Sequence, residues 1–402
     1  MCRPVRCSLL VALAPLILVT AVVSALVVPT GNAFAGTAAP KASAANLMAT
    51  AVGRPEVCSG GDSGYAIKPD GSLWVWGNDG LGELGLGDLV NRSRPTRLGR
   101  TVSWVSVATN WNYCLALKSD GSLWAWGLNV NGELGIGVES KHSDRPRRVA
   151  GSDWRAVACD LFSVAIKRDG SLWAWGINDV GELGNTTVAS SPVPVRIGTD
   201  DDWKAIAVGG FGNGLALKTN GTLWAWGGNE WGELGQGTSD DLSHPVPTQI
   251  GTDSDWVSIA AGEYSCFAIK SDGSLWAWGE NRGGQLGTGD RTNRFVPTRV
   301  GTGTGWVAVA PGWYHCLALK RDGSLWAWGS NTYGELGIGR RGALTPTLVG
   351  YGWAKIADGN DFSLAVKTNG TFWAWGSESS GQLGLGPING ARIVPTRIRT
   401  LG

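Results

Sequence analysis

The sequence predicts an all-β protein, a seven-bladed β-propeller with four strands in each blade, and three observations carry this prediction. A Trp-x-Trp pair recurs seven times, at spacings of 47 to 52 residues. Each pair follows an Asp-Gly or Asn-Gly dipeptide and precedes a glycine-rich segment. Short strands, tight turns and a period near fifty residues are typical of propeller blades. The seven pairs are Trp74/Trp76, Trp124/Trp126, Trp173/Trp175, Trp224/Trp226, Trp276/Trp278, Trp326/Trp328 and Trp373/Trp375.

The dipeptide before each pair predicts a β-hairpin. In the second repeat, residues 114–118 and 123–126 are short apolar runs joined by Ser-Asp-Gly-Ser, and Asp-Gly accepts the positive φ of a two-residue turn. Side chains alternate between the two faces of a strand, so both indoles of a pair lie on one face. We therefore expect these tryptophans to be framework residues that pack between neighbouring blades.

The glycine-rich segment after each pair carries one polar position. A ring of carboxylates there would suggest a metal or acid–base site, but two of the seven residues are Gln, which cannot ionise. The position is therefore interpreted as a structural hydrogen bond to loop amides. It is occupied by Glu83, Glu133, Glu182, Glu233, Gln285, Glu335 and Gln382.

The first 53 residues are predicted to precede the propeller. Residues 1–35 have the pattern of a secretory signal peptide, with Arg3 and Arg6, an apolar run over residues 9–28 and the small-x-small motif Ala33-Phe34-Ala35. Residues 36–53, rich in Ala, Thr and Ser, are interpreted as a flexible lead-in, and residues 54–402 as the propeller. The expected localisation is extracellular. The alternative is a membrane-anchored protein with an uncleaved leader, because about twenty apolar residues can span a bilayer.

The full unit, D-G-S-L-W-x-W-G-x-N-x-x-G-E/Q-L-G-x-G, resembles the RCC1 repeat of the regulator of chromosome condensation family, over about residues 54–402. The resemblance implies a seven-bladed propeller closed by joining the two ends of the chain. The first repeat begins at Arg54 without a leading Trp, and the chain ends with Pro395-Thr396-Arg397-Ile398, the segment that would precede such a start. We therefore expect the N- and C-terminal strands to pair within one blade, which would remove an open sheet edge.

Composition and motifs argue against several classes of function. The net charge is +1, so nothing indicates nucleic acid as a partner. No H-E-x-x-H, C-x-x-C, P-loop or G-x-S-x-G motif is present, and we expect a non-enzyme without cofactor or metal. The five cysteines after the leader are an odd number, and most fall at a small position of the repeat, so we expect packed thiols rather than a disulfide framework. They are Cys58, Cys114, Cys159, Cys266 and Cys316.

A few aromatic residues fall outside the framework. Fourteen of the 23 tryptophans lie in the pairs and six more lead the first strand of a repeat, which leaves three, in two loop classes. In an up-and-down sheet both loop classes emerge on the same side, opposite the Asp-Gly turns. Aromatic residues on such a rim are favoured at binding hot spots. The candidate partner-binding residues are Trp111, Phe211, Trp231, Tyr264, Trp313 and Tyr333.

Function does not follow from a propeller fold. The preferred hypothesis is a secreted, non-catalytic scaffold that binds an extracellular or envelope protein through this rim. One alternative is an inhibitor similar to β-lactamase inhibitor protein II, a secreted bacterial protein that resembles the same propeller. Another is a glycan-binding or glycan-processing propeller, because aromatic rings also stack on sugars.

Overall fold

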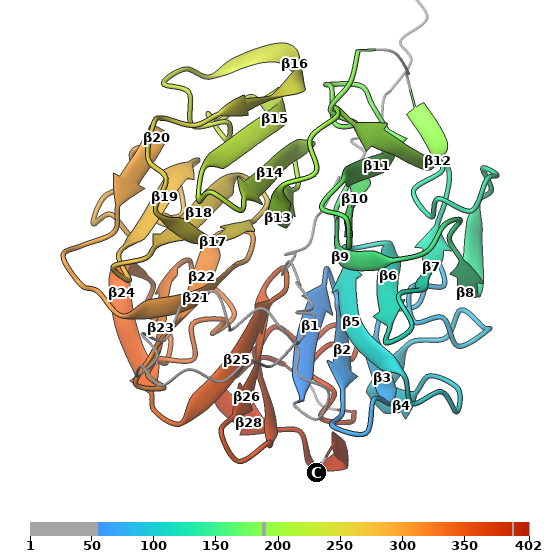
Figure 1. Ribbon diagram of the computed structural model, residues 1–402. Helices are drawn as coiled ribbons and strands as arrows, with labels where there is room; N and C mark the ends of the chain where they lie inside the picture. The colour runs from blue at the N-terminus through green and yellow to red at the C-terminus, as the bar shows by residue number, and fades with distance from the viewer. Residues whose placement is uncertain (1–54, 187–189, 388–389, 402) are drawn as a thin grey trace, which may run out of the picture.

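Seven four-stranded antiparallel sheets stand around a central axis in the computed structural model, which describes residues 55–186, 190–387 and 390–401 (Figure 1). The strands within each sheet follow chain order, so one repeat builds one blade. The predicted all-β, seven-bladed propeller is therefore confirmed. The predicted leader (residues 1–35) and lead-in (residues 36–53) lie outside the described residues.

Each blade runs from an inner strand at the axis to an outer strand at the rim. The inner strands are β1 (Glu56–Gly60), β5 (Trp104–Thr109), β9 (Trp154–Cys159), β13 (Trp203–Gly209), β17 (Trp256–Ala261), β21 (Trp306–Pro311) and β25 (Trp353–Asp358). The second strands are β2 (Ser63–Ile67), β6 (Tyr113–Lys118), β10 (Phe162–Lys167), β14 (Asn213–Lys218), β18 (Ser265–Lys270), β22 (His315–Lys320) and β26 (Phe362–Lys367).

The third strands contain the Trp-x-Trp pairs, and the outer strands contain the proline-led segments. The third strands are β3 (Leu73–Gly77), β7 (Leu123–Leu128), β11 (Leu172–Ile177), β15 (Leu223–Asn229), β19 (Leu275–Gly279), β23 (Leu325–Gly329) and β27 (Phe372–Gly376). The outer strands are β4 (Arg92–Arg97), β8 (His142–Arg148), β12 (Ser190–Ile197), β16 (Asp240–Gln249), β20 (Arg294–Arg299), β24 (Ala343–Gly350) and β28 (Arg392–Arg397). A short 3-10 helix, η2 (Arg399–Leu401), follows β28.

The hairpin between the second and third strands forms as predicted. In blade 3, Gly170 has φ +85°, and a Cβ there would lie 1.8 Å from the Asp201 carbonyl oxygen, so only glycine fits. Asp169 accepts hydrogen bonds from the Ser171 amide (2.9 Å) and hydroxyl (2.6 Å). The same hydroxyl accepts the indole N–H of Trp173, the first member of the pair, at 2.8 Å. The turn therefore orients the indole beside it.

The second tryptophan of each pair is fully buried between blades. Its indole N–H donates to the main-chain carbonyl of the Glu or Gln position in the preceding blade, as when Trp126 bonds Glu83 at 2.8 Å. Equivalent bonds link every pair of neighbouring blades, and Trp76 of blade 1 donates to the Gln382 carbonyl of blade 7 at 2.8 Å. The predicted framework role of these tryptophans is thus confirmed.

The prediction that the terminal strands pair within one blade is wrong. Among the described residues β1 pairs with β2, and β28 is the outer strand beside β27. The proline-led segment is the outermost strand in every repeat, so each repeat completes its own blade and leaves no place for a shared one. Blades 1 and 7 instead meet face to face, with β1 against β25 and β26, and Lys355 Nζ lies 2.7 Å from Glu56 Oε1 across this junction.

The five cysteines of the described residues are free and buried, as expected for packed thiols, and three of them, Cys114, Cys266 and Cys316, lie at the small repeat position. The Glu or Gln position also has its predicted role. In blade 5 the Gln285 side-chain oxygen accepts the Gly283 amide at 2.8 Å, and in blade 4 Glu233 accepts the Trp231 amide at the same distance. These side chains close their own loops and are not a ring of free carboxylates.

Candidate functional site

Two classes of loop lie on one side of the ring, which we call the loop face. In blade 5 these loops are residues 262–264, between the first and second strands, and residues 280–293, between the third and fourth strands. The Asp-Gly turns, such as residues 271–274, lie on the opposite side, which we call the turn face. The antiparallel order of every sheet gives all seven blades the same arrangement.

Five aromatic side chains from three blades form a continuous cluster on the loop face, which we call the aromatic cluster. The ring centroids of Phe211 (blade 4) and Tyr264 (blade 5) are 4.5 Å apart. Trp231 meets Tyr264 edge-on at 6.2 Å. Tyr264 is stacked on Tyr314 of blade 6 at 6.1 Å, and Tyr314 is stacked on Trp313 at 5.3 Å. All five are half-buried, so each presents part of its surface to solvent.

One cation is attached to this cluster. The guanidinium carbon of Arg282 lies 4.1 Å from the ring centroid of Trp231, within the range of a cation–π contact. The Nε atom of Arg282 is also 3.3 Å from Glu280 Oε1, although 65% of the arginine side chain remains exposed. The Arg282 guanidinium is therefore held by two contacts while most of the side chain remains open to solvent.

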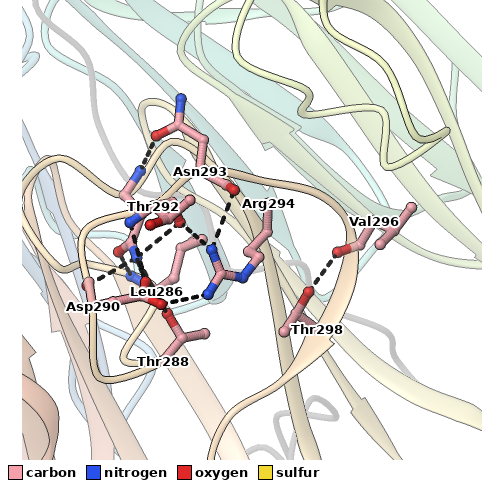
Figure 2. Close-up of polar contacts among 9 residues, drawn as sticks. Leu286, Thr288, Asp290, Thr292, Asn293, Arg294, Val296 and Thr298 are labelled. Carbon is pink, nitrogen blue, oxygen red and sulfur yellow. Dashed lines mark hydrogen bonds and ion pairs between the residues drawn. The ribbon is translucent and has the colours of Figure 1, made fainter.

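A hydrogen-bond network fixes the loop that carries Arg282 (Figure 2). The side-chain oxygen of Asn281 accepts the Leu286 amide at 3.0 Å, and its Nδ2 donates to the carbonyl oxygens of Asp290 (3.0 Å) and Thr292 (3.2 Å). Asp290 in turn pairs with Arg294 at 2.6 Å. One amide thus joins the start and the end of a long loop, and a loop held in this way presents its outward side chains in a fixed geometry.

Burial dominates the electrostatics beneath the cluster. It raises the pKa of Tyr264, and the nearby Glu263 carboxylate raises it further, so the phenol stays neutral. Burial likewise raises the pKa of Glu280, against the lowering effect of Arg282. The aromatic cluster therefore offers neutral ring surface, with its positive charge at Arg282.

The structure brings together four of the six predicted site residues, namely Phe211, Trp231, Tyr264 and Trp313. Trp111 lies apart, packed over Gly61 of blade 1, where a Cβ would be 2.3 Å from the indole. Tyr333 is 45% exposed on the glycine loop of blade 6 and makes no ring contact with another aromatic residue of the described chain.

Two members of this surface were not among the predicted site residues. Tyr314 is not among the six, although it joins Tyr264 to Trp313. Arg282 carried no signal at all, because its position is not aromatic in any repeat.

Four of the second strands begin with a large side chain that packs inside the ring, namely Tyr113, Phe162, His315 and Phe362. The environment of His315 shows that these side chains are shielded from solvent. Its Nε2 lies 2.8 Å from Asp358 Oδ1 and 3.3 Å from the Ser363 hydroxyl, and all three residues are at most 1% exposed.

A Ser, His and Asp in contact resemble a catalytic triad, but this group is sealed between two blades. The Ser363 hydroxyl donates to the Glu335 carbonyl at 2.7 Å. Burial alone would lower the pKa of His315, whereas the charge and hydrogen bond of Asp358 raise it. The trio therefore joins blades 6 and 7 as a buried polar contact and has no route to a substrate.

Two absences hold for the residues that the structure describes. Within them, no group of three or more His, Cys, Asp and Glu side chains is arranged to hold a metal ion. No helix in the same part of the chain is long and apolar enough to cross a membrane.

A ring of seven fifty-residue blades, each locked to the next by an indole–carbonyl bond, defines a β-propeller of the RCC1 type. The family model described as the RCC1-like domain matches residues 151–402, and that of the RCC1 repeat matches residues 70–117 and 120–165. The chain therefore belongs to the RCC1-like domain family, as the repeat pattern indicated.

Individual relatives match over different lengths. Human RCC2 is 40% identical over 73 residues, which are 18% of this chain and 14% of RCC2. The human E3 ubiquitin-protein ligase HERC2 is 34% identical over 73 residues, which are 18% of this chain and 2% of HERC2. The chain thus matches only a small part of these relatives' own lengths. The crystal structure of Prp20p from Saccharomyces cerevisiae is 26% identical, with a TM-score of 0.73, covering 85% of this chain and 87% of Prp20p.

Proposed function

We propose that this chain is an exported, non-catalytic propeller that binds a protein partner through its loop face. The observation that carries the proposal is the aromatic cluster, in which five half-buried rings from three blades touch one another beside an exposed arginine. Aromatic residues and arginine dominate the binding energy of protein interfaces, and clustering excludes water from the contact.

Two further points support a binding role. Prp20p, which has the same fold, was described together with its binding to Gsp1p and histones, so a propeller of this type has protein partners. The signal-like residues 1–35 favour a partner outside the cell or in its envelope, because a leader of this pattern directs export.

We predict that the double substitution Tyr264→Ala and Trp313→Ala weakens capture of the partner by about thirtyfold or more. Loss of a single hot-spot side chain costs about 2 kcal/mol, or about thirtyfold, so thirtyfold is the minimum effect for two; Tyr264 and Trp313 lie on either side of Tyr314 in the cluster. The measurement is pull-down from culture medium or envelope extract by immobilised protein, followed by titration of the partner that wild type retains.

The matched control is Tyr351→Ala. Tyr351 is 61% exposed on the turn face, where the neighbouring Trp353 amide bonds the carbonyl of Gly323 in an Asp-Gly turn. The control should bind like wild type. The double variant should melt within about 6 °C of wild type, because its residues are only half-buried. A collapse of its melting temperature would identify the cluster as core, and unchanged capture would contradict the proposal.

The same variants separate the two alternatives of the sequence analysis. Inhibition of nitrocefin hydrolysis by the wild-type protein, lost in the double variant, would identify a β-lactamase-inhibitor-like protein within the proposed class. Binding to a glycan array, together with no retained protein, would replace a protein partner with a glycan.

A further inference from the structure

A groove of about 550 Å³ runs between blades 5 and 6 on the loop face. Three arginines line it, from the loops between the third and fourth strands of these two blades, together with Tyr314 of the aromatic cluster. No acidic residue of the described chain is among its lining residues. Its side-chain lining includes Arg282, Arg291, Tyr314, Asn331, Thr332 and Arg340. The net charge of the whole chain is only +1, so this groove concentrates positive charge that the molecule as a whole does not have.

The arginines retain most of their hydrogen-bond donors. Arg282 uses its Nε toward Glu280 and its face toward Trp231, as described above. Arg291 donates one Nη1 bond to the Arg282 carbonyl at 2.7 Å. The Arg340 side chain makes no ion pair or hydrogen bond with the described residues. A guanidinium carries five N–H donors, so the groove contains more donors than its own acceptors satisfy.

Both loops that supply these arginines are held in place from below. The Asn281 network joins the two ends of the blade 5 loop, on which Arg282 and Arg291 lie. In blade 6 the equivalent Asn331 amide donates to the Gly339 carbonyl at 3.0 Å and to the Arg341 carbonyl at 2.9 Å, on either side of Arg340. Fixed loops reduce the entropy lost when a ligand orders the side chains.

We propose that this groove binds the carboxylates of an acidic segment in the partner protein, an inference that rests on the proposed function and names the chemistry of its partner. A guanidinium recognises a carboxylate through paired N–H···O bonds. Three arginines on two blades fit several carboxylates along a chain better than one small anion. Tyr314 lines the groove and belongs to the aromatic cluster, so one peptide reaches both surfaces, with acidic side chains in the groove and apolar ones on the rings.

The test measures binding of a fluorescein-labelled octaglutamate peptide to the folded chain by fluorescence anisotropy. The groove variant is Arg291→Glu with Arg340→Glu, and the control variant is Arg168→Glu with Arg321→Glu. The control arginines are exposed in hairpin turns of the turn face and change the net charge by the same amount. Octalysine, inorganic phosphate and a heparin oligosaccharide serve as comparison probes.

We expect the wild type to bind octaglutamate, to lose affinity as salt rises, and to ignore octalysine. The groove variant should bind at least tenfold more weakly, and the control variant within twofold of wild type. No binding by wild type, or an equal loss in the control, would overturn the proposal. Tighter, groove-dependent binding of phosphate or heparin would assign the groove to a different anion and also overturn it.

Failure of this inference and failure of the proposed function give different results. If the groove variant retains octaglutamate binding while the Tyr264→Ala, Trp313→Ala variant loses its protein partner, the inference fails and the proposed function stands. If the partner binds every aromatic variant normally while octaglutamate binding depends on the groove, the proposed function fails, and the groove is an anion site without the assigned partner.

Discussion

Replacing Trp226 with alanine is expected to lower the free energy of unfolding by about 3–5 kcal/mol, the usual cost of removing a buried aromatic side chain. Trp226 is fully buried between blades 3 and 4. It packs so closely on Gly214 that a Cβ there would lie 2.3 Å from its ring, and its N–H donates to the Glu182 carbonyl at 2.8 Å. The substitution leaves a cavity and an unpaired buried carbonyl. Urea-induced unfolding followed by circular dichroism measures the effect.

The neighbouring Trp224→Ala is the matched control, with the same chemical change two residues away. Trp224 is half-buried, bonds the Thr222 hydroxyl at 2.8 Å, and has the Lys218 ammonium 4.8 Å from its ring. Less apolar surface returns to water, so we expect a loss of about 1–2 kcal/mol. Equal effects of the two substitutions would show that the buried blade junction does not control stability.

The second large effect is a decrease of stability as the pH rises from about 4.5 to 8. Burial raises the pKa of Glu233 from 4.5 to about 8, of Asp79 from 3.8 to about 7, and of Asp361 from 3.8 to about 6. Between the unfolded and folded pKa values the folded state binds more protons than the unfolded state. The stability that these three protonated carboxyls contribute is therefore fully present below their pKa values in the unfolded chain. It is lost as the pH rises through their pKa values in the folded protein. Melting temperatures measured across this pH range test the direction.

Glu233→Gln is expected to remove a large part of this pH dependence. At about 1.4 kcal/mol for each pKa unit, ionisation of Glu233 costs the folded protein roughly 4 kcal/mol of stability by pH 8. The free energy of unfolding of the variant should therefore be about 2–4 kcal/mol higher than that of the wild type at pH 8 and equal to it near pH 4.5. The chain already uses Gln at this position, where Gln382 accepts the Ser380 amide at 2.7 Å.

The control for this experiment is Glu139→Gln, the same change at an exposed position of a glycine loop. It should leave the stability profile of the wild type unchanged. If Glu233→Gln also follows the wild-type profile at every pH, the buried carboxyl of Glu233 is not a source of the pH dependence.

The repeat pattern alone was sufficient to predict the blades. Asp169-Gly170 predicted a hairpin turn, and the two-residue spacing of Trp224 and Trp226 predicted that both indoles lie on one face of a strand. The pattern could not distinguish the two indoles, of which one is sealed and the other half-buried. The pattern also led to the wrong prediction for the terminal strands. The order of strands within a blade depends on which segment of the repeat lies at the axis, and a periodic sequence does not show where one repeat ends and the next begins.

The candidate site was predicted in part for a related reason. Trp231 and Trp313 were found because they break the repeat, and the up-and-down order of strands put their loops on one face. Trp111 breaks the repeat too, yet it packs on Gly61 of the preceding blade and not on the cluster. Arg282 and Arg340 were not predicted, because each is one of many residues in variable loops. Each becomes part of a site only through residues of a neighbouring blade.

The sequence by itself determined the number of blades, the turn in each hairpin, the framework role of the paired tryptophans and the choice of the loop face, since these follow from local turn chemistry and the two-residue period of a strand. The tertiary structure alone decided that blades 1 and 7 close by packing, that Phe211 and Trp231 meet Tyr264 while Tyr314 joins Tyr264 to Trp313, and that three arginines share a groove. Contacts between blades depend on the shape of the ring, which brings together loops about fifty residues apart, and a local pattern does not encode that geometry.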